Sequence, residues 1–424
     1  MPPRTRVAVL TSTGRHQVRV HGVKPRTTHW RWLIQLGVAV WSVAMLGHTI
    51  ATGVRHDYGW YLEQWALTLE GQDPWSTVAD NGNAYGPIHT GLAYLTPLDP
   101  LAPKVLMALL FLVSNFLLVR AILRRYPVPS PSAFALYVLL VPLNALVIVS
   151  VFRWGDNDAL VASLIGFALL ARFRGWLVLT GLLLGLAVLL KYYPALLVPF
   201  FCLDKRRFNW APLLAASSAV ALGLLLTWAT WGSAFLQAVR FGADRRPNLM
   251  SVFVFVEARL TDTWLIGLVE YNSVLVAAVS AMTFAAAYAL RLSWIEGSSI
   301  AMLSILFVYK IGHTQFYVPW IVLLVGLLIA GTPRSRLLLY TFMPMVIYLS
   351  AYQAFFSWYW DSGRLFPDGA FLFEQSWMPA FPLTLVTVVV AYSALLASTP
   401  SLRTQTKSDL INSIAFSSDA RSNG

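Results

Sequence analysis

Apolar runs of roughly 17 to 25 residues recur along almost the whole chain, and an α-helix of that length crosses about 30 Å of hydrocarbon. Of the 424 residues, 57% are hydrophobic and only 12% are charged. A soluble protein of this size needs more charge to cover its surface. The sequence therefore predicts an all-α polytopic membrane protein.

We expect a bundle of about 11 to 12 transmembrane helices within one domain at residues 31–398. The candidate spans are 32–52, 102–119, 132–151, 157–171, 175–190, 192–203, 211–230, 271–290, 298–310, 317–332, 337–357 and 379–397. The runs 175–190 and 192–203 are short, so they fit a re-entrant pair as well as two full crossings.

The charged residues predict the orientation of the bundle. With the N-terminus inside, most of the 31 Lys and Arg residues but few of the 19 Asp and Glu residues fall on the inner side. This positive-inside asymmetry predicts a multi-pass protein of the cell membrane with cytoplasmic N- and C-termini. The net charge of +12 is then mainly a topology signal, so we expect membrane lipids and no nucleic acid as partners.

The two ends of the chain are polar. Residues 1–30 read as a disordered, basic cytosolic arm, and residues 399–424 as a disordered cytosolic tail rich in Ser, Thr and Asn. The lone cysteine, Cys202, excludes a disulfide within the chain.

Three outer loops, at about 53–101, 231–270 and 358–378, indicate that the chemistry takes place on the extracytoplasmic face, and the second could close over a substrate. Basic residues on the outer side are not explained by insertion, so each is a candidate for function. They include Arg55, Arg153, Lys191, Arg240, Arg245, Arg246, Arg259 and Lys310.

The stretch VRHDYGWYLEQWALTLEGQDPW follows the first span. Its apolar residues have helical spacing from Tyr58 to Leu69, and Gly71 and Pro74 end the run. We expect an amphipathic helix in the headgroup plane, with its aromatic rings at interface depth. Asp57 begins this helix, either as a cap or as a catalytic carboxylate, and the two roles are compatible.

Two further stretches are less specific. In NGNAYGPIHTGLAYLTPL, Gly86-Pro87 breaks the chain before a short apolar helix that dips back to the membrane. In VFRWGDNDALVASL, Arg153, Asp156 and Asp158 gather at an outer turn. In one interpretation an aspartate caps the next helix and Arg153 forms a salt bridge with it. In the other, Arg153 binds a phosphate and a carboxylate binds a sugar hydroxyl or a metal ion. Two carboxylates are too few to predict a divalent ion.

Lys191 lies within LAVLLKYYPALLVPFF, a long stretch with no other charge. A lysine at this depth costs a few kcal/mol unless its ammonium group reaches water or a partner. It is either a snorkelling lysine at a helix end or part of an anion site. The neighbouring Tyr192-Tyr193-Pro194 indicates a shaped turn, which suits the anion site better.

The stretch VYKIGHTQFYVPW places Lys310, His313, Gln315 and Tyr317 where a short span ends on the outer face. A single histidine in a membrane protein is often only hydrogen-bonded within the bundle. Four polar side chains in eight residues beside apolar helices indicate a lined cavity instead. One carboxylate beside an interfacial helix, with cations on the same side, suits a substrate with an anionic phosphate and a lipid tail.

Four short stretches resemble a known group. Asp57-Tyr58 after the first span, EGQDPW and AYGPIH are similar to membrane glycosyltransferases of the C superfamily, which use polyprenyl-phosphate sugars. GLAVLLKYYPALLVPF and GHTQFYVPW resemble family 87 mannosyltransferases. The first loop also resembles GPI mannosyltransferase I, whose motif has two aspartates where this chain has Arg55 and Asp57.

The resemblance implies a C-superfamily bundle in which Asp57 removes a proton from the acceptor hydroxyl. It also implies that the Lys-Tyr-Tyr-Pro and Gly-His stretches bind the donor, and that no metal or other cofactor is needed, although a divalent metal is not excluded. The candidate ligands of the donor phosphate are Lys191, His313, Arg153, Arg245 and Arg246. The candidate substrate-binding residues are Tyr58, Glu63, Tyr85, Asp156, Asp158, Tyr192, Lys310, Gln315 and Tyr317.

The sequence thus predicts an inverting glycosyltransferase that moves a hexose, by resemblance mannose, from polyprenyl monophosphate to a glycolipid or glycan acceptor. One rival is a transporter or flippase that uses the same charges as a translocation path, but it should place charges mid-span. A second rival is a polysaccharide polymerase, which would need the larger cationic site that Arg240, Arg245 and Arg246 could provide.

Overall fold

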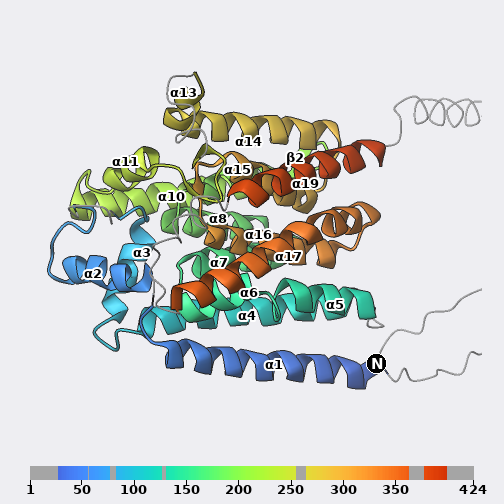
Figure 1. The fold of residues 1–424 in the computed structure, drawn as a ribbon, viewed down its shortest axis with the longest axis horizontal. Coiled ribbons are helices and arrows are strands. Elements are labelled where there is room, and N and C mark those ends of the chain that lie inside the picture. The colour runs from blue at the N-terminus through green and yellow to red at the C-terminus, as the bar shows by residue number, and fades with distance from the viewer. Residues whose placement is uncertain are drawn as a thin grey trace, which may run out of the picture.

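The computed structural model describes residues 27–55, 57–76, 83–126, 130–254, 264–361 and 377–398. Most of the predicted arm and the whole predicted tail therefore lie outside the described residues, as does most of the loop at 358–378. The described residues form a bundle whose long helices run along one common direction (Figure 1).

The first half of the bundle follows the predicted spans closely. Its elements are α1 (Thr27–Thr52), α2 (Asp57–Leu69), α3 (Pro87–Gly91), the 3₁₀ turn η1 (Leu92–Leu95), α4 (Ala102–Arg125), α5 (Pro131–Leu140), α6 (Ala145–Val147), the π-helical η2 (Ile148–Trp154), α7 (Asp158–Phe173), α8 (Leu177–Leu190), the 3₁₀ turn η3 (Tyr193–Leu197), α9 (Val198–Cys202), and the strands β1 (Leu203–Asp204) and β2 (Arg207–Phe208).

The second half contains longer connections at one end of the bundle. Its elements are α10 (Trp210–Trp231), α11 (Leu236–Asp244), β3 (Asn248–Leu249), α13 (Trp264–Glu270), α14 (Asn272–Ala289), α15 (Trp294–Val308), β4 (Ile311–Gly312), the 3₁₀ turn η4 (Thr314–Phe316), α16 (Tyr317–Ala330), α17 (Pro333–Asp361) and α19 (Trp377–Ala397).

Seven helical segments in the described part of the chain are long and apolar enough to cross a membrane: His29–Thr52, Ala102–Arg125, Pro131–Trp154, Trp210–Trp231, Asn272–Ala289, Pro333–Tyr359 and Pro379–Ala397. Shorter apolar helices cover four more predicted spans. The all-α polytopic membrane fold is confirmed, and the chain is an integral membrane protein.

Burial separates central from peripheral helices. Nearly every residue of α7, α15 and α16 is buried, because these helices are apolar all round and have neighbours on every side. The long helices α1, α10 and α14 instead expose large apolar side chains such as Val43, Leu225 and Val274. That distribution suits a bundle whose outer face meets lipid.

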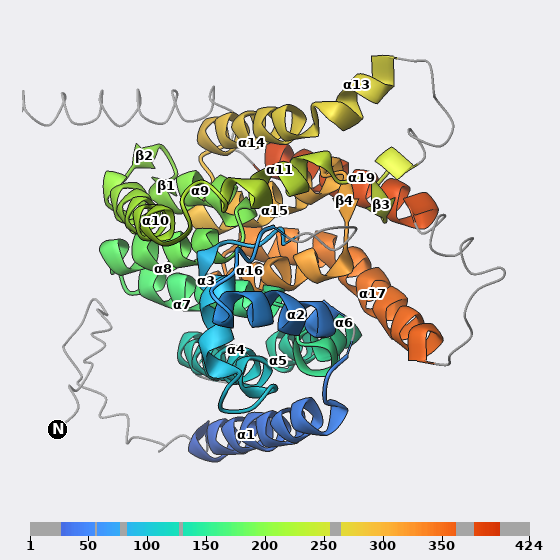
Figure 2. The same cartoon turned by 90° about the vertical axis from the view of Figure 1, so that its left-hand side faces the viewer.

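The two ends of the bundle differ. In Figure 1, α1 begins and α19 ends at one end, whereas α2, α3 and α11 lie at the other. Figure 2 looks onto this second end, where α2 passes across the middle of the view and α11 lies above it, towards α14. By the positive-inside rule, this is the end that the sequence predicts to be extracytoplasmic.

A lysine that we did not single out in the sequence holds this end together. The side chain of Lys104 in α4 is fully buried, and its ammonium group donates to Thr52 Oγ1 (3.1 Å) and to the carbonyls of Gly53 (2.7 Å) and Arg153 (2.6 Å). Gly155, with φ of +75°, follows η2, and its added Cβ would lie 2.7 Å from the Lys104 side chain. Three donated hydrogen bonds therefore fix where α1 and η2 end.

The predicted interfacial helix exists as α2, but its aromatic face does not lie among lipid headgroups as we expected. Tyr58, Tyr61 and Trp65 are at most 1% exposed, and the Trp65 indole donates to the His89 carbonyl at 2.8 Å. The aromatic face packs onto α3 and η1 because the chain folds back beneath it. Its exposed residues include Trp60 and Leu69.

Two short strand pairs connect distant segments. The antiparallel pair β1–β2 makes a tight hairpin between α9 and α10. The parallel pair β3–β4 joins Asn248 and Leu249 to Ile311 and Gly312, so the segment after α11 is attached beside the start of α16. This second pair brings part of the 231–270 loop to the site described below.

Candidate functional site

A cavity of about 480 Å³ lies at the end of the bundle that carries α2 and α11. Its walls come from α2, the segment before α3, the turn between α8 and η3, α11, α14, α15, and the segment that contains β4 and η4. These elements are separated by up to about 260 residues in sequence, so only the tertiary fold assembles the cavity.

One face of α2 supplies the acidic wall. Asp57, Tyr61 and Gln64 line the cavity because spacings of four and three residues place them on the same side of a helix. Asp57 is the first residue of α2 and is 7% exposed. It is the carboxylate that lines the cavity among the described residues.

Tyr85 reaches the cavity because Gly86 packs directly on the end of α8. The Gly86 amide donates to the Leu190 carbonyl at 2.9 Å, and a Cβ on Gly86 would lie 2.1 Å from the Leu189 carbonyl oxygen. Only glycine allows this approach, which holds the Tyr85 ring over Lys191.

Lys191 is buried, and its positive charge is balanced by a carboxylate. Its ammonium group contacts Asp158 Oδ2 at 2.5 Å, and Asp158 Oδ1 accepts a hydrogen bond from the Tyr193 hydroxyl at 3.0 Å. The ammonium group also lies 5.1 Å from the ring centre of Tyr85 and 4.9 Å from that of Phe316. The ion pair and the two aromatic faces replace the water that a lysine loses at this depth.

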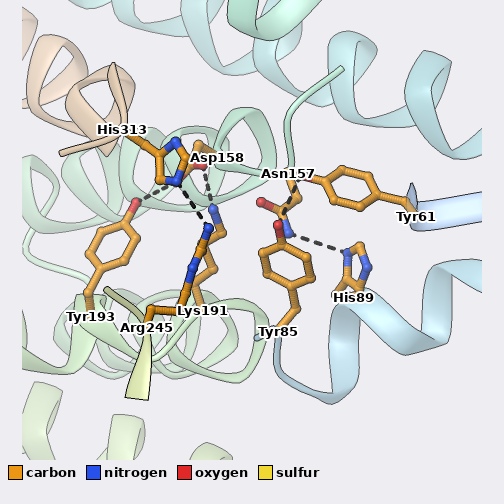
Figure 3. A network of polar contacts seen from close by, with 9 residues as sticks. All are labelled: Tyr61, Tyr85, His89, Asn157, Asp158, Lys191, Tyr193, Arg245 and His313. Carbon is orange, nitrogen blue, oxygen red and sulfur yellow. Dashed lines mark hydrogen bonds and ion pairs between the residues drawn. The ribbon is translucent and has the colours of Figure 1, made fainter. Parts of the chain in front are cut away.

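The opposite wall contains His313, which two donor side chains contact, and Figure 3 shows one of them, Arg245. Asn248 Oδ1 accepts from the Gly312 amide at 3.1 Å, so its Nδ2 faces His313 Nε2, at 3.2 Å. Arg245 NH2 lies 3.3 Å from the same nitrogen. Since both neighbours can only donate, Nε2 accepts, and the ring is neutral with its proton on Nδ1. Arg245 therefore brings the positive charge of this wall.

A layer of polar side chains supports the α2 wall from behind. His89 in α3 donates from Nε2 to Gln64 Oε1 (3.3 Å) and accepts at Nδ1 from Asn157 (3.4 Å). Burial, aided by the charge of Lys191, holds the pKa of His89 well below its usual range, so the ring stays neutral. Neutral His89 thus links α2, α3 and the start of α7.

Two tyrosines complete this wall, as Figure 3 shows. The hydroxyls of Tyr61 and Tyr85 are 3.4 Å apart. Burial raises the pKa of both phenols, and the nearby carboxylate of Asp57 raises it further. Both therefore remain protonated and present hydroxyl groups close to Asp57.

The structure brings eight of the predicted site residues to this cavity: Asp57, Tyr85, Lys191, Tyr192, Arg245, Lys310, His313 and Gln315. Their roles stay predictions. Lys310 is anchored by its backbone amide, which donates to Asn272 Oδ1 at 3.0 Å, and its ammonium group donates to the Val269 carbonyl at 3.4 Å.

The other predicted residues lie elsewhere. Asp158 is behind the wall, bound to Lys191, and Tyr58, Asp156 and Tyr317 are buried outside the cavity lining. Glu63 and Arg246 are exposed, and Arg153 lines a different cavity. In the described ranges, no three His, Cys, Asp or Glu side chains gather in a way that could hold a metal ion.

Several residues of the site were absent from our sequence prediction. Tyr61 and Gln64 could have been found from the helical spacing that begins at Asp57. His89 and Asn157 carried no such signal, because their partners lie in other helices. Asn248 carried no such signal either, because its partners Gly312 and His313 lie more than 60 residues away in the chain.

A family model described as glycosyltransferase family 87 matches residues 84–311, which is more than half of the chain. The matched range includes Tyr85, Lys191, Arg245 and Lys310, whereas Asp57 precedes it and His313 follows it. No curated protein matches the chain.

Proposed function

The chain belongs to glycosyltransferase family 87, and from this membership we propose that it transfers mannose from polyprenyl monophosphate to a lipid- or polymer-linked acceptor. The reaction proceeds with inversion, on the extracytoplasmic face of the membrane. The glycosyltransferase family argues against the transporter and flippase alternatives.

One observation carries the proposal. The cavity has a carboxylate on the α2 wall and three basic side chains, Lys191, Arg245 and Lys310, on its other walls. A glycosyl transfer from a phosphate donor needs these two kinds of group on either side of the sugar.

Asp57 acts as the general base in the proposed reaction. The acceptor hydroxyl oxygen attacks the anomeric carbon and its proton passes to the Asp57 carboxylate, while the bond from that carbon to the phosphate oxygen breaks. The electron pair of this bond leaves with the phosphate. A single displacement of this kind inverts the anomeric centre.

The cations stabilise the departing phosphate. In the proposed reaction Arg245 and Lys310, which line the cavity, stabilise the negative charge that the leaving group gains. Lys191, held by Asp158, adds a third cation. A phosphate leaves as an anion without the strong acid that glycoside hydrolysis requires. One carboxylate is therefore enough for this chemistry.

The lining also suits a lipid-linked donor. Beyond the charged residues, α11, α14 and α15 contribute Val239, Val276, Ile305 and Leu306. An apolar surface next to a cationic site favours a phosphate that carries a hydrocarbon chain. The polymerase alternative needs a larger cationic site, but of its three arginines Arg245 lines the cavity while Arg240 and Arg246 are exposed.

The proposal is tested by sugar transfer with the purified full-length protein in phospholipid vesicles. Three radiolabelled donors are compared: polyprenyl-phosphate mannose, nucleoside-diphosphate mannose and polyprenyl-phosphate glucose. Membrane extract supplies the acceptors. We expect transfer from polyprenyl-phosphate mannose, with and without a chelator. Transfer from the nucleotide sugar alone would contradict the donor class, and loss of activity with chelator would contradict the metal-free reaction.

Gly86→Ala tests how the site is positioned. The added methyl group collides with the Leu189 carbonyl, so Tyr85 must shift away from Lys191. We expect about a 10²-fold loss in kcat/KM, because a displacement of about 1 Å can cost that much. Gly91→Ala is the matched control, since its Cβ would meet no atom within 4 Å. Wild-type rates in Gly86→Ala would show that this contact does not set the geometry.

A further inference from the structure

A second cavity, of about 400 Å³, lies between η2 and α17 and shares no lining residue with the first. One wall comes from Ala145, Ile148, Val149 and Arg153, and the other from Ala354, Ser357 and Trp358. The reaction proposed above uses none of these residues. Apart from Arg153, Ser357 and the indole of Trp358, the lining is aliphatic.

Arg153 is held in place from both sides. Its backbone carbonyl accepts from the buried Lys104 ammonium group at 2.6 Å, and its NH1 donates to Ser357 Oγ at 3.0 Å. It belongs to η2, the π-helical segment, and such segments are frequent at functional sites. The guanidinium group is therefore positioned along the cavity before any ligand arrives.

The depth of the cavity in the membrane follows from the helices that form it. The Lys104 ammonium group bonds Thr52, the last residue of the α1 span, and the backbone carbonyl of Arg153, which is one residue from the end of the Pro131–Trp154 span. From these span ends we place Arg153 near the membrane boundary. Ala145 and Ile148 precede Arg153 in the same span and lie deeper. Trp358, 56% exposed, is near the end of the α17 span, at the level where interfacial tryptophans are common.

The helical segments that form the cavity also expose apolar side chains nearer the middle of their spans. Leu139 and Leu143 on the first side are 44% and 66% exposed, and Ile347 on α17 is 58% exposed. A cation at headgroup depth above an apolar track complements a molecule with an anionic phosphate and hydrocarbon chains. The lining residues within the described ranges include no Asp or Glu that would repel it.

We propose that this second cavity binds an anionic membrane phospholipid, with its headgroup phosphate on Arg153 and Ser357 and its chains along α5 and α17. Bidentate hydrogen bonding to phosphate favours arginine at such a position. The bound lipid would fill the gap between η2 and α17 at the outer end of the bundle.

Native mass spectrometry of the full-length protein in detergent tests the proposal. The protein is titrated with phosphatidylglycerol, and separately with phosphatidylcholine that has the same chains, to obtain the Kd of the first bound lipid. We expect tighter binding of phosphatidylglycerol and, in Arg153→Gln, about a five-fold weaker Kd for that lipid, which corresponds to about 1 kcal/mol for one basic residue. Binding of phosphatidylcholine, in which the positive choline offsets the phosphate charge, should weaken less.

Arg240→Gln, at an exposed position on α11 at the same end of the bundle, is the matched control and should bind both lipids as the wild type does. Arg153→Lys should keep part of the preference, because it retains the charge but loses the bidentate hydrogen bonds, and this separates loss of charge from misfolding. Equal Kd values for the two lipids, or an unchanged preference in Arg153→Gln, would overturn the proposal. The proposal would also be overturned if inorganic phosphate displaced the bound lipid as effectively as soluble phosphatidylglycerol does. The readout is lipid binding, so its failure leaves the proposed transfer reaction untouched.

Discussion

Asp57→Asn should lower the rate of sugar transfer by about 10²- to 10⁴-fold, the contribution typical of a general base. The amide has nearly the same shape as the carboxylate and can still lie at the start of α2, so the fold should be retained. The loss should appear in kcat, because the proton is transferred in the reaction step rather than on binding. Steady-state transfer rates and the melting temperature in detergent measure the two effects separately.

Glu70→Gln is the matched control for this substitution. Glu70 follows the end of α2, is exposed and lies outside the cavity lining, so its change should leave the rate unaltered. If Asp57→Asn transferred sugar at the wild-type rate, Asp57 would serve only to begin the helix. Another carboxylate would then have to be the base.

Asp158→Asn should have the largest effect on stability. It leaves the Lys191 ammonium group buried without its counter-charge, and breaking a buried ion pair from one side costs about 3–5 kcal/mol. Tyr193 also loses its charged acceptor. Unfolding in detergent, followed by circular dichroism, should show a lower melting temperature, and transfer activity should fall with it.

The double variant Asp158→Asn with Lys191→Met separates stability from function. Because it removes both charges, it should recover most of the lost stability. It should not recover transfer, since the cation that we propose to bind the donor phosphate is gone. Asp244→Asn, at an exposed position in α11, is the control and should melt as the wild type does. If the double variant were as unstable as Asp158→Asn, the Lys191–Asp158 pair would contribute to stability by more than charge balance.

The membrane fold could be predicted from the sequence because its signal is local. A helix that faces lipid must satisfy its backbone hydrogen bonds within itself, so each crossing leaves a continuous apolar run. The predicted span 211–230 is observed as Trp210–Trp231, and 379–397 lies within α19, which begins at Trp377. The helix from Asp57 to Leu69 was predictable in the same way, from residue spacing within one element.

The partners of the site residues could not be predicted in this way. The sequence identified Lys191 as a charge in an apolar stretch, and Arg153, Asp156 and Asp158 as a cluster at one turn. In the structure Lys191 forms an ion pair with Asp158, and Arg153 lines the second cavity. Each choice depends on how α7, α8 and α17 pack, and hydrophobic periodicity within one helix carries no information about which helix lies beside it.

The sequence by itself therefore determined that this protein is an all-helical membrane protein, and it indicated several of the polar stretches that meet at one end. Only the tertiary structure decided which side chains share a cavity. It turned the aromatic face of α2 inward onto His89, joined Asn248 to Gly312 through a two-residue strand pair, and separated Arg153 from Arg245. The physical reason is that span formation depends on local transfer into lipid, whereas the site depends on contacts between segments far apart in the chain.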